Sequence, residues 1–197
     1  MDLVPEYGLL IGSIGCGRAS TEQVLVKAGR EVHGVDISEE AIKVAKKRIT
    51  SASVITNEML MPFAENSLDG LILADVLEHM PKAWQRLEQF AKMVKPGGWI
   101  LISVPNMRQL RVIYTLVIRG DWPENPTGIF DDTHIQVMTH KRLLRWADQS
   151  NLSLVKWQNS YFYRPQITAI YKLINALTFN YFKGFFDYQI MGLFVKK

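Results

Sequence analysis

Two glycines and an acidic residue in the first part of the chain carry its clearest chemical signal. Gly15 and Gly17 follow one apolar run, and Asp36 ends the next one. Because glycine has no Cβ, a ligand can approach such a turn closely, and the N–H groups that open the following helix face any anionic group placed there. A carboxylate in the position of Asp36 can accept hydrogen bonds from both hydroxyls of a ribose. The spacing therefore predicts a site for a nucleoside-containing cofactor.

Strand-like and helix-like segments alternate through the first half of the 197 residues and would position this turn. This alternation predicts right-handed crossovers and a doubly wound, mostly parallel, Rossmann-like sheet with helices on both faces. A ligand would then lie at the carboxyl ends of the strands. Strands are expected at 9–14, 31–35, 53–56, 70–74 and 99–104, and helices at 19–28, 38–49 and 84–94. Ser38 is the expected N-cap of the second helix, and residues 95–98 are expected to form a turn before the fifth strand.

The alternation lapses in the second half. Residues 107–118 are expected to be helical, and 119–133 are irregular and too long for an ordinary connection. The segment from about 107 to 138 is therefore expected to be a lid or an acceptor-binding insertion within one domain, 1–197. Further elements complete a sheet of seven strands: a helix capped by Thr139, a strand at 152–157, a helix at 166–183 and an antiparallel closing strand at 187–195.

The motifs, in this order, resemble those of the class I S-adenosylmethionine-dependent methyltransferases. Gly15-Cys16-Gly17 resembles the first motif of that family, and the segment 34–38 is similar to its second-strand ending. The resemblance covers nearly the whole chain, with further matching motifs at 61–69, 75–80 and 94–98. The tract 128–134, followed by Met138-Thr139, is similar to a bacterial subgroup that acts on small molecules or sugar-containing acceptors. What the resemblance implies is methyl transfer to such an acceptor, at an oxygen atom.

The resemblance implies S-adenosylmethionine as cofactor. No metal ligand is expected, and the single cysteine, Cys16, excludes a metal site made of cysteines alone. Asp36 would hold the ribose, Asn57 would meet the adenine amino group, and Ser13 would hydrogen-bond the methionine amino group. Ser13 stands where the family most often has Asp or Glu, so a loss of about 1 kcal/mol or more is expected for replacing a charge-assisted bond by a neutral one. The residues expected to bind the cofactor are Ser13, Gly15, Cys16, Gly17, Asp36, Ile37, Asn57, Glu58, Ala74 and Asp75.

Two histidines are candidates for catalysis, since a hydroxyl acceptor must lose a proton. His134 lies in the irregular segment, and an ordinary histidine has a pKa near neutrality. Its alternative role is to hydrogen-bond the backbone of Asp131 or Asp132 and shape the loop. His79, together with Glu78, could also reach the methyl group, although capping and packing at a helix entrance is the commoner role for such residues.

Composition limits the remaining choices. With 48% hydrophobic and 21% charged residues the chain is typical of a globular protein. It begins without the features of a signal peptide and lacks an apolar run of membrane-spanning length, so a cytoplasmic protein is expected. The basic residues behind its net charge of +4 are scattered along the chain, and no nucleic-acid partner is expected.

The aromatic-rich segment 161–188 is interpreted as core, with a membrane-surface helix or an aromatic acceptor pocket as alternatives. The oligomeric state is not predicted.

Two other functions fit part of the pattern. A nicotinamide-dependent oxidoreductase also uses a glycine turn and a second-strand acid. In its fingerprint a third small residue packs the helix on the strand, and the presence of Ser20 at that place weakens this alternative. The 62–79 tract disfavours an oxidoreductase further. A module that keeps the fold and binds cofactor without turnover is the second alternative, because Ser13 cannot supply a counter-charge.

Overall fold

The computed structural model describes residues 3–56, 61–161, 173, 176–178 and 183–197. These residues form one seven-stranded sheet with the strand order β3-β2-β1-β4-β5-β7-β6. Strand β7 pairs antiparallel with both β5 and β6, whereas the other neighbours pair in parallel. The predicted fold class is confirmed. The strands are β1 (Leu10–Ile14), β2 (Glu31–Asp36), β3 (Ser51–Val54), β4 (Leu68–Ala74), β5 (Val94–Pro105), β6 (Leu152–Tyr161) and β7 (Asp187–Lys196).

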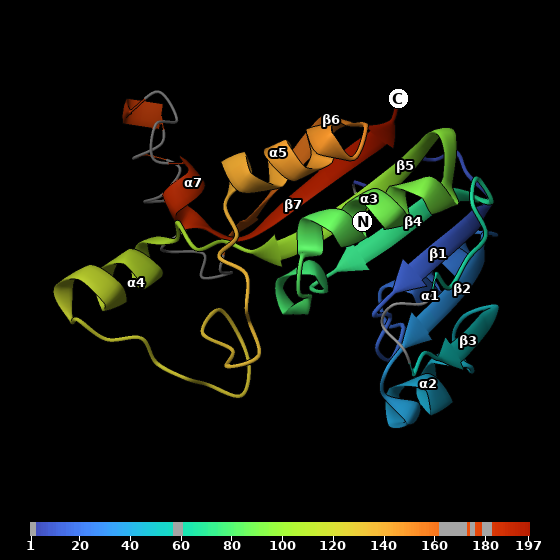
Figure 1. The fold of residues 1–197 in the computed structure, drawn as a ribbon, viewed down its shortest axis with the longest axis horizontal. Coiled ribbons are helices and arrows are strands. Elements are labelled where there is room, and N and C mark those ends of the chain that lie inside the picture. The colour runs from blue at the N-terminus through green and yellow to red at the C-terminus, as the bar shows by residue number, and fades with distance from the viewer. Residues whose placement is uncertain (1–2, 57–60, 162–172, 174–175, 179–182) are drawn as a thin grey trace.

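Helices cover both faces of this sheet. In Figure 1, α3 and α5 lie side by side over the face toward the viewer. Leu71 and Leu73 of β4 pack in the same core cluster as these helices, whereas Ile72 between them belongs to the cluster that contains α1 and α2. Burial on both faces is why β4 is continuously apolar. The helices are α1 (Glu22–Lys27), α2 (Glu39–Ala45), α3 (Ala83–Met93), α4 (Leu110–Ile113), α5 (His140–Gln149) and α7 (Lys183–Phe186), with a 3-10 turn η1 (Leu77–His79) and a π turn η2 (Tyr114–Ile118).

Several predicted element ends are confirmed by side-chain contacts. The Ser38 hydroxyl accepts a hydrogen bond from the Ala41 N–H at 3.2 Å, and the Thr139 hydroxyl accepts one from the Arg142 N–H at 3.2 Å. Each bond satisfies one of the N–H groups that a helix leaves unpaired at its start. The two sequence-predicted N-caps thus begin α2 and α5.

Other boundaries differ from the prediction for local reasons. Helix α1 begins at Glu22 rather than at residue 19, because Ala19 has a φ of +53°, which is incompatible with a right-handed helix. The turn expected at 95–98 lies inside β5 as an irregularity of the ladder: Val94 pairs with Leu68 and Trp99 with Gly70, so the four residues between Val94 and Trp99 have no partner in β4. The predicted helix at 166–183 falls mostly outside the described residues.

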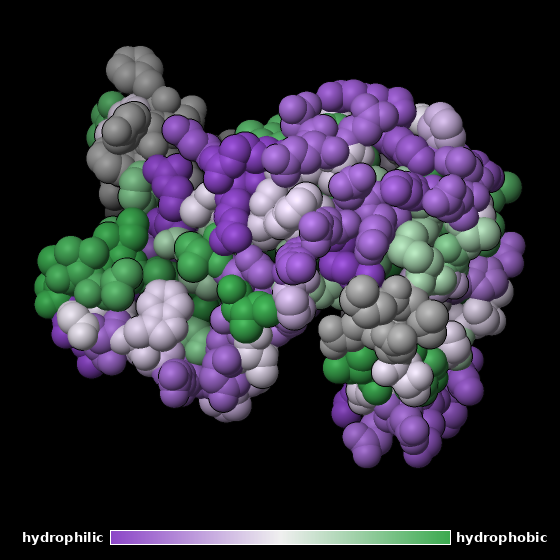
Figure 2. Space-filling model, in the orientation of Figure 1, coloured by the Kyte–Doolittle hydropathy of each residue, from purple (hydrophilic) through white to green (hydrophobic). Residues whose placement is uncertain are grey.

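The order of the strands creates a crevice. From β1 the chain proceeds to β2 and β3 on one side, and β4 returns to the other side of β1. At such a reversal the connections leave in opposite directions, and a space opens beyond the carboxyl ends of the strands. Figure 2 shows the surface hollowed there, between the lobe with α4 and the lobe with α2.

The segment 107–138 follows β5 and joins the main core at its end through Met138. Helix α4 projects away from the sheet in Figure 1. A small core forms within the segment, of Met107, Val112, Ile129 and Phe130, and Tyr188 of β7 packs against it. The role of the segment as a lid or acceptor-binding insertion stays a prediction. Among the described helices, none has both the length and the apolar character needed to cross a bilayer.

Candidate active site

A largely apolar cavity of about 460 Å³ lies at the carboxyl ends of β1 and β4. Gly15, Asp36 and Ile37 line it at the β1 and β2 side, and Asp75, His79 and Thr133 line it at the β4 side. Its apolar wall includes Ile55, Pro62 and Phe90. Concave, mostly apolar pockets with a few polar groups are typical of cofactor sites.

The glycine turn forms one wall of this cavity. Gly15 and Gly17 have φ values of +67° and +53°, a region that other residues rarely adopt. A Cβ on Gly15 would lie 2.5 Å from Cγ2 of Val76, which is far inside contact distance, whereas a Cβ on Gly17 would meet no atom within 4 Å. The backbone at Gly17 therefore borders open space in which a ligand can approach it.

Asp36 holds two loops together at the end of β2. Its Oδ2 accepts a hydrogen bond from the Gly17 N–H at 2.7 Å, and its Oδ1 accepts one from the Ser38 N–H at 2.9 Å. A carboxylate oxygen accepts more than one hydrogen bond, so Asp36 retains acceptor capacity where it lines the cavity. Beside it, Ile37 is 68% exposed and forms part of the same wall.

Ser13 is turned away from the cavity wall and into the core. Its hydroxyl donates a hydrogen bond of 2.8 Å to Oε1 of Glu22, and the two residues are only 1% and 4% exposed. Burial raises the pKa of Glu22, while hydrogen bonds from its own backbone and from Ser13 oppose the shift. Helix α1 thus supplies an acid, Glu22, beside Ser13, the strand position at which the family most often has Asp or Glu. Glu22 was not predicted as a buried acid, although it precedes the core residue Leu25 by three positions and therefore shares its helix face.

Cys16 contributes its backbone to the turn but not its side chain to the cavity. Its N–H donates to the Val35 carbonyl at 3.1 Å, and its Sγ occupies the space beside Gly34, where a Cβ would lie 2.7 Å away. Burial, with the nearby charges of Asp36 and Glu22, raises the pKa of the thiol to about 12. The side chain fills space between β1 and β2.

We therefore expect Cys16 to resist alkylation while the protein is folded. At pH 8 a thiol with a pKa of about 12 carries roughly a thousandth of the thiolate of an ordinary one. Iodoacetamide labelling followed by mass spectrometry should be at least a hundredfold slower for the folded chain than for the chain in denaturant. Similar rates in the two states would contradict the buried placement.

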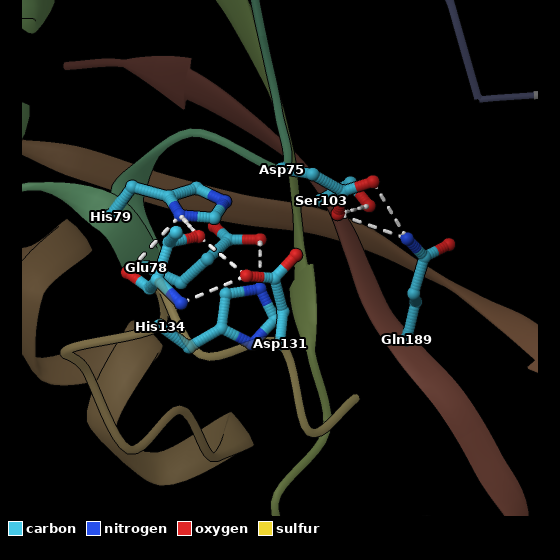
Figure 3. A network of polar contacts seen from close by, with 8 residues as sticks. Asp75, Glu78, His79, Ser103, Asp131, His134 and Gln189 are labelled. Atoms are coloured by element: carbon cyan, nitrogen blue, oxygen red, sulfur yellow. Dashed lines mark hydrogen bonds and ion pairs between the residues drawn. The ribbon is translucent and has the colours of Figure 1, made fainter. Parts of the chain in front are cut away.

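Asp75 is anchored by the far side of the sheet. It has a φ of +54°, and its carboxylate accepts hydrogen bonds from Nε2 of Gln189 at 2.9 and 2.8 Å and from the Ser103 hydroxyl at 3.2 Å (Figure 3). A non-glycine residue at positive φ persists only where its surroundings enforce it, and β5 and β7 supply those contacts here. Ala74, the preceding residue, is exposed at the end of β4. The predicted ligands Asn57 and Glu58 lie outside the described residues.

A second cavity of about 220 Å³ adjoins the first. Asp75 and His79 line both, and the second is further lined by Glu78, Asp131, His134, Tyr188 and Gln189. The structure thus brings together the two sequence-predicted histidines, whose ring centroids are 4.8 Å apart.

The orientation of His79 is set by the 131–134 loop. Its Nδ1 lies 2.9 Å from the Thr133 hydroxyl and 3.3 Å from the Thr133 carbonyl, and the hydroxyl itself donates to Asp131 (Figure 3). The carbonyl can only accept, and the hydroxyl proton is already used, so Nδ1 is the nitrogen that carries hydrogen. The lone pair of neutral His79 is therefore on Nε2.

Glu78, a candidate in the sequence only together with His79, lies in surroundings that the sequence did not predict. It is fully buried, and neither carboxylate oxygen has a hydrogen-bond partner within the described part of the chain. Its nearest basic group is Nε2 of His134, 4.0 Å away. Burial is the main cause that raises the pKa of Glu78 to about 8, and the charges of Asp75 and Asp131 add to the effect. Burial, followed by the charge of His79, lowers the pKa of His134.

Comparison with known sequences agrees with this arrangement. Residues 13–102 match the model of a methyltransferase domain. The ubiquinone biosynthesis O-methyltransferase of Cupriavidus pinatubonensis is 27% identical over 186 residues, which cover 90% of this chain and 73% of that protein. The protein of the same name from Coxiella burnetii is 30% identical over 150 residues, covering 72% of this chain and 62% of that protein.

Solved structures show the same fold. An S-adenosylmethionine-dependent methyltransferase from Mesorhizobium loti has a TM-score of 0.68 at 18% identity, covering 99% of this chain and 94% of that one. Magnesium protoporphyrin IX methyltransferase from Synechocystis, with bound S-adenosylhomocysteine, has a TM-score of 0.65 at 18% identity, covering 96% and 75%. The matched domain contains the glycine turn, Asp36 and Asp75, the three features around which the first cavity is built. The chain belongs to the class I S-adenosylmethionine-dependent methyltransferases.

Proposed function

We propose that this methyltransferase transfers the methyl group to a hydroxyl oxygen of a small molecule. The observation that carries the proposal is the pair of adjoining cavities, which share Asp75 and His79. One cavity fits a nucleoside-containing cofactor, and the other offers carboxylates and histidines to an acceptor. The O-methyltransferase names of the relatives support oxygen as the methylated atom.

The first cavity suits S-adenosylmethionine. Asp36 would accept hydrogen bonds from the ribose hydroxyls, and Gly15 lines the cavity beside it. The open space at Gly17 would let the cofactor approach the backbone of the same turn. The apolar wall at Ile37 and Ile55 would contact the adenine, with Asn57 and Glu58 as further expected ligands. Cys16 would act through its backbone alone. Ser13 would act through the hydroxyl that it shares with Glu22, so the pair replaces the acid more usual at that strand position.

Catalysis would depend mainly on alignment. The sulfonium of the bound cofactor already activates the methyl group, so this chain must place the acceptor oxygen behind that carbon, exclude water and remove the hydroxyl proton. Three groups of the second cavity are placed to act on that proton: Glu78, His79 and His134. We assign its removal to the three together, because burial lowers the pKa of His134 and makes it a weak base on its own.

The acceptor class can be tested with cofactor carrying a labelled methyl group. We expect methyl ethers from phenols, catechols or other small hydroxyl compounds, identified by mass spectrometry. Labelling of amines in preference to hydroxyls would overturn the proposal. A sugar-containing acceptor, the finer alternative suggested by the sequence, would be favoured if only glycosides in the panel were labelled. A chain that binds cofactor and labels none of these compounds would instead be the non-catalytic module.

The loop that orients His79 provides a second test. Thr133→Val keeps the size of the side chain but removes the hydroxyl between His79 and Asp131. We expect kcat to fall about tenfold, since misplacing a catalytic group is costly, and the dissociation constant of S-adenosylhomocysteine to change less than kcat, although Thr133 also lines the first cavity. Thr133→Ser should retain most of the activity. If Thr133→Val kept full activity, the loop would not orient the histidine.

A further inference from the structure

We propose that the outer face of α4 and η2 is the interface at which two copies of this chain form an antiparallel, two-fold dimer. Leu110, Tyr114, Val117 and Ile118 recur at the spacing of one helix face and form what we call the outer stripe. Their exposed fractions are 51%, 53%, 68% and 69%. Such a stripe on a surface helix normally packs against the core, but here it is open to solvent. Figure 2 shows hydrophobic surface on the lobe with α4.

The other side of these helical turns already has its partners. Val112 and Thr115 are 3% and 5% exposed. Val112 belongs to the small core of the segment, together with Met107, Ile129 and Phe130. The outer stripe takes no part in that core. It is therefore apolar surface that the described part of the chain does not use for its own packing.

The exposed area is close to what one half of a dimer interface needs. Leu116 and Trp122 are 51% and 45% exposed and extend the apolar surface. A hydrogen bond from the Asp121 N–H to the Thr115 carbonyl, at 3.1 Å, turns the chain back toward η2 just before Trp122. With the outer stripe, these side chains expose roughly 600 Å², since a large apolar residue has an area of about 150 to 250 Å².

An apolar patch of this size is uncommon on a protein that stays monomeric, where contiguous patches rarely exceed a few hundred Å². A stable interface buries about 800 Å² on each partner. Its centre is apolar and its rim is polar. The outer stripe, Leu116 and Trp122 supply such a centre, and the charged residues around them supply the rim.

The charges of this rim favour a second copy as the partner. Arg111 lies near the beginning of the outer stripe, whereas Asp121 and Glu124 lie beyond its end, and all three are exposed. Neither carboxylate forms an ion pair with another residue that the structure describes. In a two-fold interface each contact between two different residues occurs twice. An antiparallel crossing therefore brings the basic end of each copy to the acidic end of the other.

A lipid surface suits these charges less well. The segment 108–124 contains three arginines and two acidic residues, so its net charge is +1. Helices that lie on anionic membranes are rich in Lys and Arg on their polar face, and recognition of anionic lipids typically uses about four to eight basic residues. The mixed charge of this segment fits a self-complementary protein interface better.

The dimer would also support the acceptor side of the active site. Ile129 belongs to the small core and lines the second cavity, as do Asp131 and His134 of the adjoining loop. The outer stripe lines neither cavity. A second copy would therefore hold this loop from outside without entering the site.

The mass of the full chain in solution tests the dimer directly. Analytical ultracentrifugation should show a species of twice the 22.6 kDa of one chain, with a dissociation constant of about 10 μM or tighter. A chain that stays monomeric at about 100 μM would overturn the proposal. The measurement needs no acceptor, so its outcome is independent of the proposed function.

A single charge on the outer stripe locates the interface. Val117→Glu should weaken dimerisation at least about a hundredfold, because each copy would bury an unpaired carboxylate. Val24→Glu is the matched control, since Val24 is also a helical valine, 49% exposed, but lies on α1. Both variants should bind S-adenosylhomocysteine like the unaltered chain, which shows that they are folded. Equal dimerisation of the two variants would overturn the proposal.

Charge reversal tests the antiparallel arrangement. Arg111→Glu should weaken the dimer about tenfold, and so should Asp121→Arg combined with Glu124→Arg, because like charges would then face each other. The chain with all three substitutions should recover most of the affinity, which a folding defect could not produce. Absence of this recovery would overturn the antiparallel dimer.

Vesicles distinguish the second copy from a lipid surface. We expect the unaltered chain to remain in the supernatant when vesicles of phosphatidylglycerol and phosphatidylcholine are sedimented at low salt. A monomeric chain that sediments with these vesicles, and loses this binding in Val117→Glu, would overturn the dimer and identify a lipid as the partner.

Discussion

Asp36→Ala is expected to weaken binding of S-adenosylmethionine by roughly 1 to 3 kcal/mol, the range for a lost hydrogen bond to a charged group. About 1.4 kcal/mol corresponds to a tenfold change in the dissociation constant. The effect should lie toward the upper end, because Asp36 also accepts hydrogen bonds from the N–H groups of Gly17 and Ser38. The variant would lose both a contact to the ribose and the bonds that order the glycine turn. Calorimetric titration with the cofactor measures the change directly.

Asp69→Ala provides the matched control for this experiment. Asp69 also accepts two backbone hydrogen bonds, from Leu9 and Leu10 at 2.9 Å each, and contacts Lys95. It lies at the opposite end of β1 and does not line the first cavity. We expect this variant to lose stability but to bind the cofactor within twofold of the unaltered chain. Equal affinities for the two alanine variants would remove Asp36 from the cofactor site.

Gly15→Ala is expected to abolish measurable cofactor binding and to destabilise the fold. Two destabilising effects act together at Gly15, backbone strain and a steric clash with Val76. The backbone has a φ of +67°, which costs a residue with a Cβ about 1 to 2 kcal/mol, and the added carbon would lie 2.5 Å from Cγ2 of Val76. Relief of that contact requires the turn or the start of η1 to move, and both border the cavity. Urea unfolding would measure the stability, and calorimetry would measure the binding.

Gly97→Ala separates these two terms. Gly97 has a φ of +75°, but a Cβ there would meet nothing within 4 Å. This variant should therefore show the backbone cost alone, with cofactor affinity unchanged. Adding Val76→Ala to Gly15→Ala should recover part of the stability, since it removes the contact but not the backbone strain. Normal cofactor binding by the single Gly15→Ala variant would show that the turn does not approach the ligand.

The features that could be predicted from the sequence are those set by neighbouring residues. The alternation of apolar strands and capped helices indicated the sheet, and Ser38 and Thr139 cap the helices expected of them. The placement of the two catalytic candidates side by side was not predictable, because it depends on the path of the 119–133 segment. A loop of this kind has no periodic pattern from which its course can be inferred.

The missed residues depend on contacts between distant parts of the chain. Gln189 holds Asp75 from 114 positions away. Glu78 was considered only together with His79, since nothing in its local sequence shows that it would be fully buried without a hydrogen bond. Glu22 was within reach of pattern analysis, yet its partner Ser13 is the reason that burial is tolerated. In each case the chemistry of the side chain was visible in the sequence and its surroundings in the folded chain were not.

The position of β7 has a consequence for how the protein folds. This strand follows β6 in the chain but lies between β5 and β6 in the sheet, and it carries Gln189 to the active site. During synthesis β5 and β6 are therefore made before the strand that joins them, and each has an unpaired edge until β7 inserts. Such long-range strand pairing is slow and leaves intermediates open to aggregation. A chain in which β7 has not inserted therefore lacks the hydrogen bonds from Gln189 to Asp75, and only Ser103 of β5 holds that carboxylate.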